Sequence, residues 1–204
     1  MTNLTFKQYR NIDLTILSIF LIISEAITTV ATNTWFAAQP IAISTTIVFI
    51  CIFMMRWGAF AAIPAVLGGL VFSITSGASI EQILIYSVGN LATLAALMWF
   101  KVWKKDDIRL GTFKLFFFTS SVYILAQIGR WIISLAFGGG LWNFVGYIAS
   151  DIISLLFAVV LMFILRKVDG MIEDQKAYLL RLDRERKEER AAEMSAYMGF
   201  GDED

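Results

Sequence analysis

Long apolar stretches separated by short polar connections constrain the fold of this chain more than any other feature. A helix needs about 20 mainly apolar residues to cross the roughly 30 Å hydrocarbon core of a bilayer. Several stretches have or approach that length, and 58% of the 204 residues are hydrophobic, which is more than soluble domains contain. The sequence therefore predicts an all-α integral membrane protein with six transmembrane helices. They are expected at about 14–33, 38–55, 58–76, 83–100, 113–137 and 141–166.

The basic residues are concentrated in alternate connections between these stretches. Sixteen of the 17 Lys and Arg residues lie before the first stretch, between the second and third, between the fourth and fifth, after the sixth, or within two residues of these connections. The other connections hold a single charge, Glu81. Because cytoplasmic loops are enriched in Lys and Arg, this pattern places both termini in the cytoplasm. We expect a multi-pass protein of the cell membrane, namely of a bacterial plasma membrane.

Three regions follow from this topology. Residues 1–13 form a cytoplasmic N-terminus, residues 14–167 form the transmembrane domain, and residues 168–204 form a charged cytosolic tail. Opposite charges at a spacing of four, as in Arg181 with Glu185, predict a solvated helix in the tail. The tail is either a plain solvated segment or a helix that docks on a partner or on the membrane surface.

The composition narrows the function classes. The 17 basic residues are balanced by 17 acidic ones, so no net charge favours nucleic acid as a partner. The chain has no histidine and one cysteine, Cys51, so it lacks the commonest general base and any cysteine-based metal site. We expect no enzyme activity, no metal and no cofactor bound by this chain.

Four predicted helices carry a charged or amide side chain at a similar depth. The helical rise of 1.5 Å per residue places Glu25 and Arg130 roughly 10–12 Å below the outer surface, with Asn90 and Asp151 near that level. Lipid cannot satisfy such groups, so they are expected to face the bundle interior or water. The sequence therefore predicts a pocket in the outer half of the bundle.

Other residues extend this predicted pocket. Residues three, four or seven apart line one side of a helix, so each polar residue gains companions on its own face. Aromatic residues near the outer helix ends either wall the pocket or lie in the membrane interface. The predicted substrate-binding residues are Glu25, Trp35, Tyr86, Asn90, Gln127, Arg130, Trp131, Asn143, Tyr147 and Asp151.

Two alternatives concern the charges in this layer. Arg130 and Asp151 either form a purely structural ion pair or contact a ligand. Glu25 is either ionised, which gives the layer a net negative charge suited to a cation, a zwitterion or a donor-rich neutral molecule, or it is protonated.

Two stretches, MMRWGAFAAIPAVLGGLVFSITSGAS at 54–79 and IYSVGN at 85–90, resemble the S components of energy-coupling factor (ECF) transporters. The resemblance spans about 10–167 and includes the number of helices, the cytoplasmic termini and the polar groups near the outer face. It implies that the protein binds a vitamin-like or other small polar micronutrient from outside. A transmembrane coupling subunit and two ATPase subunits would then deliver it inward. The chain has no Walker A loop, so only those partners would use ATP.

In that family, small residues form the surface that docks on the coupling subunit, often alanines spaced by four on the first helix. The first stretch here lacks such a pair. The resemblance therefore shifts the predicted docking residues to the third stretch, and packing within the bundle is the alternative. These residues are Gly58, Ala61, Ala65 and Gly68.

A function of a different class also fits the sequence. The protein would be a non-transporting membrane scaffold that recruits a partner through its charged tail. Such a scaffold would depend on the tail and not on Arg130 and Asp151.

Overall fold

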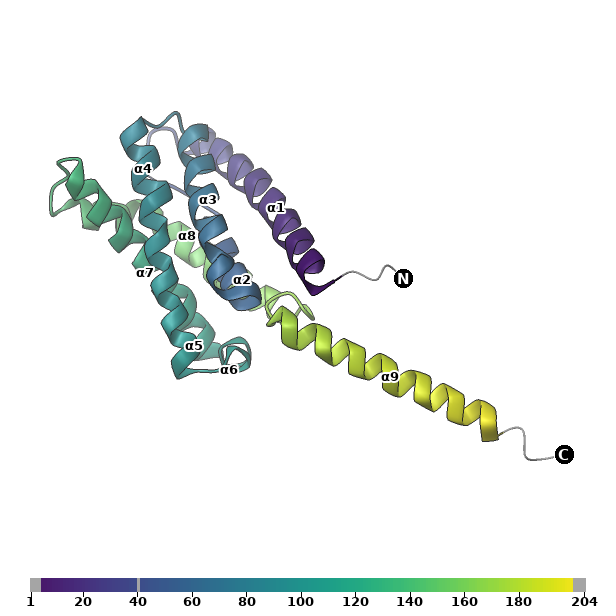
Figure 1. Ribbon diagram of the computed structural model, residues 1–204. Helices are drawn as coiled ribbons and strands as arrows, with labels where there is room; N and C mark the ends of the chain where they lie inside the picture. Colours follow the sequence, from purple (N-terminus) through teal and green to yellow (C-terminus); the bar gives the residue numbers. More distant parts are fainter. Residues whose placement is uncertain (1–4, 40, 200–204) are drawn as a thin grey trace.

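The computed structural model describes residues 5–39 and 41–199, and the regular structure of these residues is entirely helical. Figure 1 shows that the long helices form a bundle and that α9 projects from one end of it. The predicted all-α architecture is thus confirmed for the described part of the chain. The helices are α1 (Phe6–Trp35), α2 (Thr46–Trp57), η1 (Gly58–Ala61), α3 (Ala62–Thr75), α4 (Ile80–Gly89), η2 (Asn90–Met98), α5 (Trp99–Val102), α6 (Lys105–Leu110), α7 (Thr112–Ala136), α8 (Asn143–Leu165) and α9 (Gln175–Gly199).

Within the described ranges, five helical segments are long and apolar enough to cross a membrane. Their outward faces carry exposed apolar side chains, such as Ile27 on α1, Phe116 on α7 and Leu156 on α8. Exposed apolar surface of this extent suits contact with lipid, and the fold is compatible with a multi-pass membrane protein. The segments are Phe6–Trp35, Thr46–Thr75, Ile80–Val102, Thr112–Ala136 and Asn143–Leu165.

The segment Thr46–Thr75 is a hairpin and not one straight helix. α2 ends at Trp57, and the φ of 63° at the next residue, Gly58, lets the chain turn into η1 and then α3. Thr46, at the beginning of α2, lies against Gly68 of α3, so the two helices fold back on each other. α2 has 12 residues and is therefore about 18 Å long, which is too short to cross the hydrocarbon core alone. A count of six transmembrane helices remains a prediction.

The predicted start of the second helix, at residue 38, is wrong. α2 begins at Thr46, and residues 41–45 form a non-helical segment. The backbone N–H of Ala42 donates to the carbonyl oxygen of Ser150 in α8 at 2.8 Å, a contact that a helix here would not make. Pro40 lies outside the described residues.

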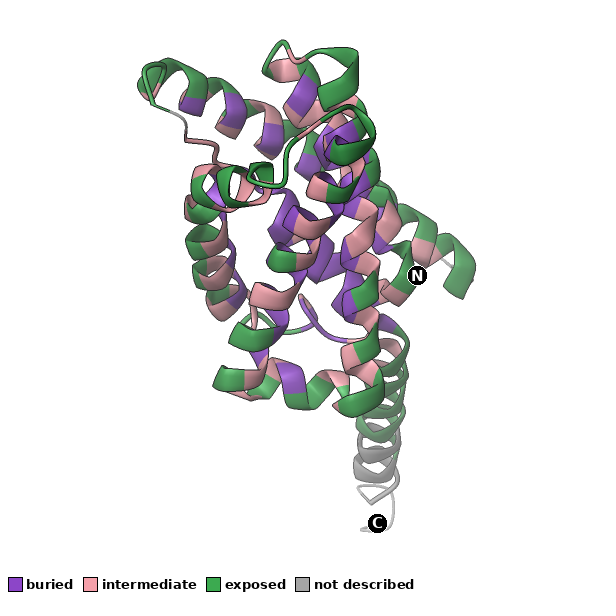
Figure 2. Cartoon of the chain, turned by 90° about the vertical axis from the view of Figure 1, so that its left-hand side faces the viewer, coloured by how far each residue is buried: buried purple, intermediate pink, exposed green. Residues whose placement is uncertain are grey.

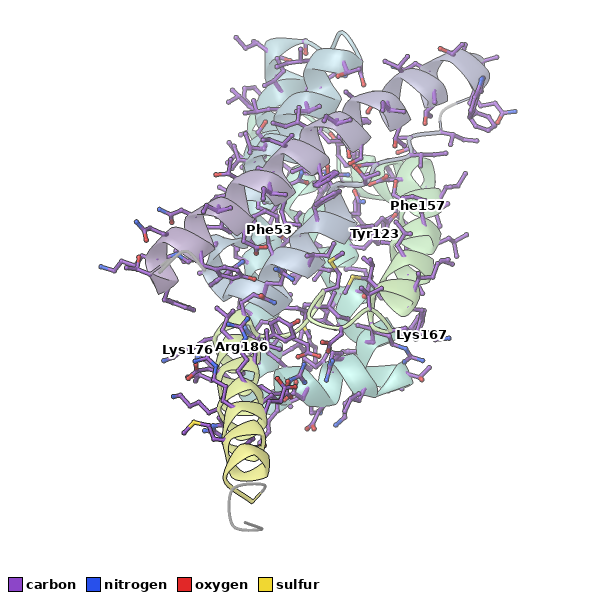
Figure 3. The ribbon with its side chains drawn as sticks, turned by 90° about the vertical axis from the view of Figure 1, so that its right-hand side faces the viewer. Phe53, Tyr123, Phe157, Lys167, Lys176 and Arg186 are labelled. Atoms are coloured by element: carbon purple, nitrogen blue, oxygen red, sulfur yellow. The ribbon has the colours of Figure 1, made fainter. Side chains whose placement is uncertain are left out.

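α2 is the centre of the hydrophobic core. Every residue from Thr46 to Arg56 is buried except Phe49, which is partly buried. A helix that is apolar on all sides is surrounded either by protein or by lipid. Here protein surrounds it, since α2 packs on α1, α3, α7 and α8. Buried residues accordingly gather in the middle of the bundle in Figure 2. Figure 3 labels Phe53 and Tyr123 in this core and Phe157 on the more exposed side of α8.

Two glycines bring α4 and α7 into backbone contact. A Cβ atom built on Gly89 would lie 2.7 Å from the Cα atom of Arg130, and one built on Gly129 would overlap the carbonyl oxygen of Gly89. Directly after this crossing the chain changes from α4 to η2, a 3-10 helix of nine residues. Such long 3-10 runs are uncommon and often mark a functional or strained position. The crossing places Asn90 beside Arg130.

The first turns of α1 and the linker before α9 lie at the same end of the bundle. Arg56 donates to Asp13 from Nη2 at 2.6 Å, and its Nη1 donates to the carbonyl oxygen of Gly170 at 2.5 Å. The Tyr9 hydroxyl donates to Gln175 at 3.0 Å. The beginning of the predicted tail is therefore packed on the bundle. We call the opposite end, formed by the end of α1 and the α3–α4 turn, the far end (Figure 1).

Ion pairs also attach the linker to α6. Arg109 pairs with Glu173, and Lys105 Nζ lies 2.6 Å from Asp174. Burial opposes ionisation of Asp174, but the hydrogen bond and charge of Lys105, with backbone N–H groups of α9, outweigh it. The pKa of Asp174 is therefore lowered.

The α4–α7 crossing yields the first prediction. Gly129→Ala should lower the free energy of unfolding by about 1–3 kcal/mol, the usual cost of overpacking, because the new methyl group meets backbone that cannot move aside. The measurement is thermal unfolding of the purified protein in detergent. Gly146→Ala in α8 is the matched control, since no heavy atom from outside its own stretch of helix backbone lies within 4 Å of its Cβ position. Equal stability of both variants would contradict the close backbone contact between α4 and α7.

Candidate functional site

A buried polar network surrounds Arg130 in the middle of the bundle. Its Nη1 donates to Asp151 at 2.8 Å and to Gln127 at 3.2 Å, and its Nε donates to Asn90 at 2.9 Å. Asn90 in turn donates to the carbonyl oxygen of Ala65 in α3 at 3.2 Å. The guanidinium carbon also lies 4.7 Å from the ring centroid of Tyr86. The structure thus brings together five of the ten predicted site residues, from α4, η2, α7 and α8.

Asp151 connects this network to the non-helical segment 41–45. One carboxylate oxygen, Oδ2, accepts from Arg130 and from Gln127, the latter at 2.9 Å. The other oxygen accepts from the hydroxyl of Ser154. Ser154 Oγ accepts from the backbone N–H of Ser44 at 2.8 Å. Both oxygens of Asp151 are therefore occupied by protein donors.

Glu25 lies on the other side of that segment and contacts neither Arg130 nor Asp151. Its Oε2 accepts from the backbone N–H of Thr45 at 2.8 Å and from the Thr45 hydroxyl at 2.7 Å. These contacts place the carboxyl group of Glu25 at the N-terminus of α2, where it accepts a backbone N–H that has no partner within the helix. Glu25 therefore holds the beginning of α2 and does not line the cavities described next.

Two adjoining cavities lie between the network and the far end. The deep cavity has a volume of about 10 Å³, room for about one water molecule. The far-end cavity has a volume of about 310 Å³. Ala42, Phe72 and Tyr86 line both, so these three residues form the boundary. The deep cavity is lined by Ala42, Ser44, Thr46, Gly68, Gly69, Phe72, Tyr86, Asn90, Arg130 and Asp151.

The far-end cavity is polar but has no charged lining residue. Hydroxyl and amide side chains surround it, together with a few apolar ones. One of these groups, the buried Thr29 hydroxyl, has no hydrogen-bond partner in the structure. The lining consists of Thr29, Thr32, Asn33, Ile41, Ala42, Phe72, Ser76, Gly77, Ala78, Gln82 and Tyr86.

Four other predicted site residues lie outside both cavities. Trp35 is 77% exposed at the end of α1, and Asn143 is exposed at the beginning of α8. Trp131 packs on Phe144, with ring centroids 5.7 Å apart. Tyr147 does not line the cavities but packs on Tyr86, which does. The two rings are edge-to-face, with centroids 6.3 Å apart.

The predicted docking surface is wrong for three of its four residues. Ala61, Ala65 and Gly68 are buried within the bundle, and only Gly58, at the α2–η1 turn, is partly exposed. A methyl group on Gly68 would collide with Thr46, so this small residue permits the close packing of α3 on α2. The structure therefore favours the alternative, packing within the bundle.

Sequence reasoning missed the segment 41–46 and the α3 residues Gly69 and Phe72. The run Ser44, Thr45 and Thr46 was a usable signal, because three consecutive hydroxyl residues are unusual inside a transmembrane helix and are typical of a helix N-terminus. Gly69 permits the backbone of α4 to approach, since its Cβ would lie 2.5 Å from the carbonyl oxygen of Tyr86.

Comparison of the chain with protein-family models, curated proteins and solved structures finds no significant match. Among the described residues, no group of three or more Cys, Asp or Glu side chains is arranged to hold a metal ion.

The ion pair yields the second prediction. Asp151→Ala should lower the free energy of unfolding by about 3–5 kcal/mol, because it leaves the buried Arg130 without its counter-charge. The double variant Asp151→Ala with Arg130→Met should be more stable than this single variant, since it removes the uncompensated charge as well. Chemical or thermal unfolding in detergent measures both. A double variant less stable than Asp151→Ala would show that the pair is not the dominant interaction.

Proposed function

We propose that this protein is the substrate-binding membrane subunit of an uptake system, of the kind formed by the S components of ECF transporters. The observation that carries the proposal is the far-end cavity of about 310 Å³, which adjoins the buried Arg130 network. Its volume is at the lower end of the range typical of small-molecule sites, about 300–1,000 Å³. A small polar micronutrient is the class of solute that such a cavity suits.

The packing of the bundle supports a binding subunit in preference to a channel. Toward the end where the termini lie, the core is filled by apolar side chains of α2, including Phe53, Met54 and Met55, all fully buried. The two cavities end above this core, so a solute that enters from the far end meets a closed floor. Delivery to the other side then requires partner proteins. The resemblance to ECF S components implies that these partners are a coupling subunit and two ATPases.

The orientation of the protein follows from its charges. The basic connections favour the cytoplasm for the end with both termini, so the far end faces outside. The binding cavity is then open to external solute, as uptake requires. In a bacterium this membrane is the plasma membrane.

The far-end cavity yields the third prediction. A small-molecule extract of bacterial cells should raise the thermal unfolding temperature of the purified protein, because a ligand that binds only the folded state stabilises it. Ala78→Trp should abolish this rise, since the indole fills the cavity that Ala78 lines. Ala136→Trp, at an exposed position in α7 outside the cavity, is the matched control and should keep the rise. If the extract does not raise the unfolding temperature of the wild-type protein, the proposed binding function is wrong.

A second candidate, a scaffold that recruits a partner through α9, is favoured by the exposure of this helix. Residues 183–190 are exposed throughout, and α9 extends away from the bundle in Figure 1. Opposite charges on its surface form ion pairs, such as Lys187 with Asp183 at 2.8 Å.

The tail yields the fourth prediction, which separates the two candidates. Deleting residues 182–204 keeps the contacts of the linker with the bundle and should leave the extract-induced thermal shift unchanged. A binding subunit needs its cavity, whereas a scaffold needs its tail. A lost thermal shift after this deletion would contradict a binding site confined to the bundle.

A further inference from the structure

Given the proposed function, we infer that the solute carries one carboxylate group, which binds between Arg130 and Thr46, and a neutral hydrogen-bonding body, which occupies the far-end cavity. The inference names the chemical class of the ligand and rests on the proposed function. Donors and acceptors that the protein leaves without partners around the two cavities support it.

Arg130 has one guanidinium nitrogen left for a ligand. Its Nε and Nη1 donate to Asn90, Gln127 and Asp151, whereas no hydrogen bond among the described residues uses Nη2. The side chain is only 3% exposed, and it lines the deep cavity. A carboxylate oxygen is the acceptor that suits such a charged donor best.

Thr46 supplies a second donor at the same cavity. Its hydroxyl is buried and has no hydrogen-bond partner, and its side chain lines the deep cavity with Arg130. Thr46 is also the first residue of α2, a helix of 12 residues, so the positive end of the helix dipole lies at this place. An oxygen anion is stabilised by all three features.

Neither acidic residue nearby offers a free oxygen to the two cavities. Both oxygens of Asp151 accept from protein donors. Glu25 binds Thr45 through Oε2 and leaves the buried Oε1 without a partner, but it lines neither cavity. An ammonium group in the deep cavity would therefore meet Arg130 without a free carboxylate to compensate.

The sizes of the two cavities decide between a carboxylate and a larger anion. The deep cavity, at about 10 Å³, admits a group of the size of one oxygen atom. A carboxylate can insert one oxygen there, whereas a phosphate would bring further charged oxygens against the side chains of Phe72 and Tyr86, which line the boundary. The remainder of the solute lies in the far-end cavity, whose lining offers hydroxyl and amide groups and no charge.

The experiment separates the small-molecule extract on an anion-exchange resin at neutral pH. The anionic fraction, after removal of phosphate esters with a phosphatase, should stabilise the wild-type protein against thermal unfolding, and the unbound fraction should not. Arg130→Gln should abolish this stabilisation. Mass spectrometry of the molecule released from the washed protein should then identify a carboxylic acid.

Thr46→Val tests the site without relying on a variant that disturbs the network. It removes a hydroxyl that has no partner, so its thermal stability without ligand should be equal to or above that of wild type. It should nevertheless need about tenfold more of the anionic fraction for half-maximal stabilisation, the loss expected for one hydrogen bond to a charged group. Ser73→Ala is the matched control, because Ser73 is also buried without a partner but lines neither cavity.

The outcomes distinguish the inference from the proposed function. Stabilisation by the unbound fraction alone, or a released solute without a carboxylate, would overturn the inference and leave the binding function standing. Stabilisation that is lost with phosphatase treatment would assign a phosphate ester and overturn the inference as well. Stabilisation by no fraction would overturn both. A Thr46→Val variant that responds as Ser73→Ala does would remove Thr46 from the site.

Discussion

The structure depends on the hydrogen bonds that the bundle makes to the polar backbone groups of one non-helical stretch. Residues 41–45 run between the helices, where neither lipid nor regular structure binds their polar groups, and such groups are costly when left alone. Ser150 and Ser154 of α8 bind the segment on one side, and Glu25 of α1 binds Thr45 on the other. Because Ser154 also binds Asp151, the support of this segment and the placement of Arg130 belong to one continuous network. A substitution that disturbs the support of this segment should therefore also displace Arg130, and the reverse should hold as well.

Part of this network was predictable from the sequence, because depth in a membrane follows from topology and helical rise. Arg130, Asp151 and Asn90 were expected at one level, and the structure joins them through hydrogen bonds. Depth gives no information on which neighbour a side chain faces. Glu25 was therefore assigned to the pocket, although it contacts the beginning of α2. Its partner, Thr45, lies in a segment that is apolar enough to look like part of a helix.

The other errors have a common physical cause. Small residues permit close packing of helices, but a sequence does not show whether the partner helix belongs to the same chain. Ala65 and Gly68 are therefore equally consistent with a docking surface and with the interior, and the structure places them in the interior. The turn at Gly58 was predicted near its observed place, whereas the short length of α2 was not. Apolar composition continues through residues 41–45 and hides the point at which the helix begins.

The central position of α2 also separates it from the bilayer. Helices that face lipid are subject to hydrophobic mismatch, since their apolar length has to agree with the thickness of the membrane. α2 packs on α1, α3, α7 and α8, and nearly all of it is buried. Its length of 12 residues is therefore set by the protein interior alone. A membrane of different thickness would tilt the outer helices but would act on the beginning of α2, beside the proposed solute site, only through them.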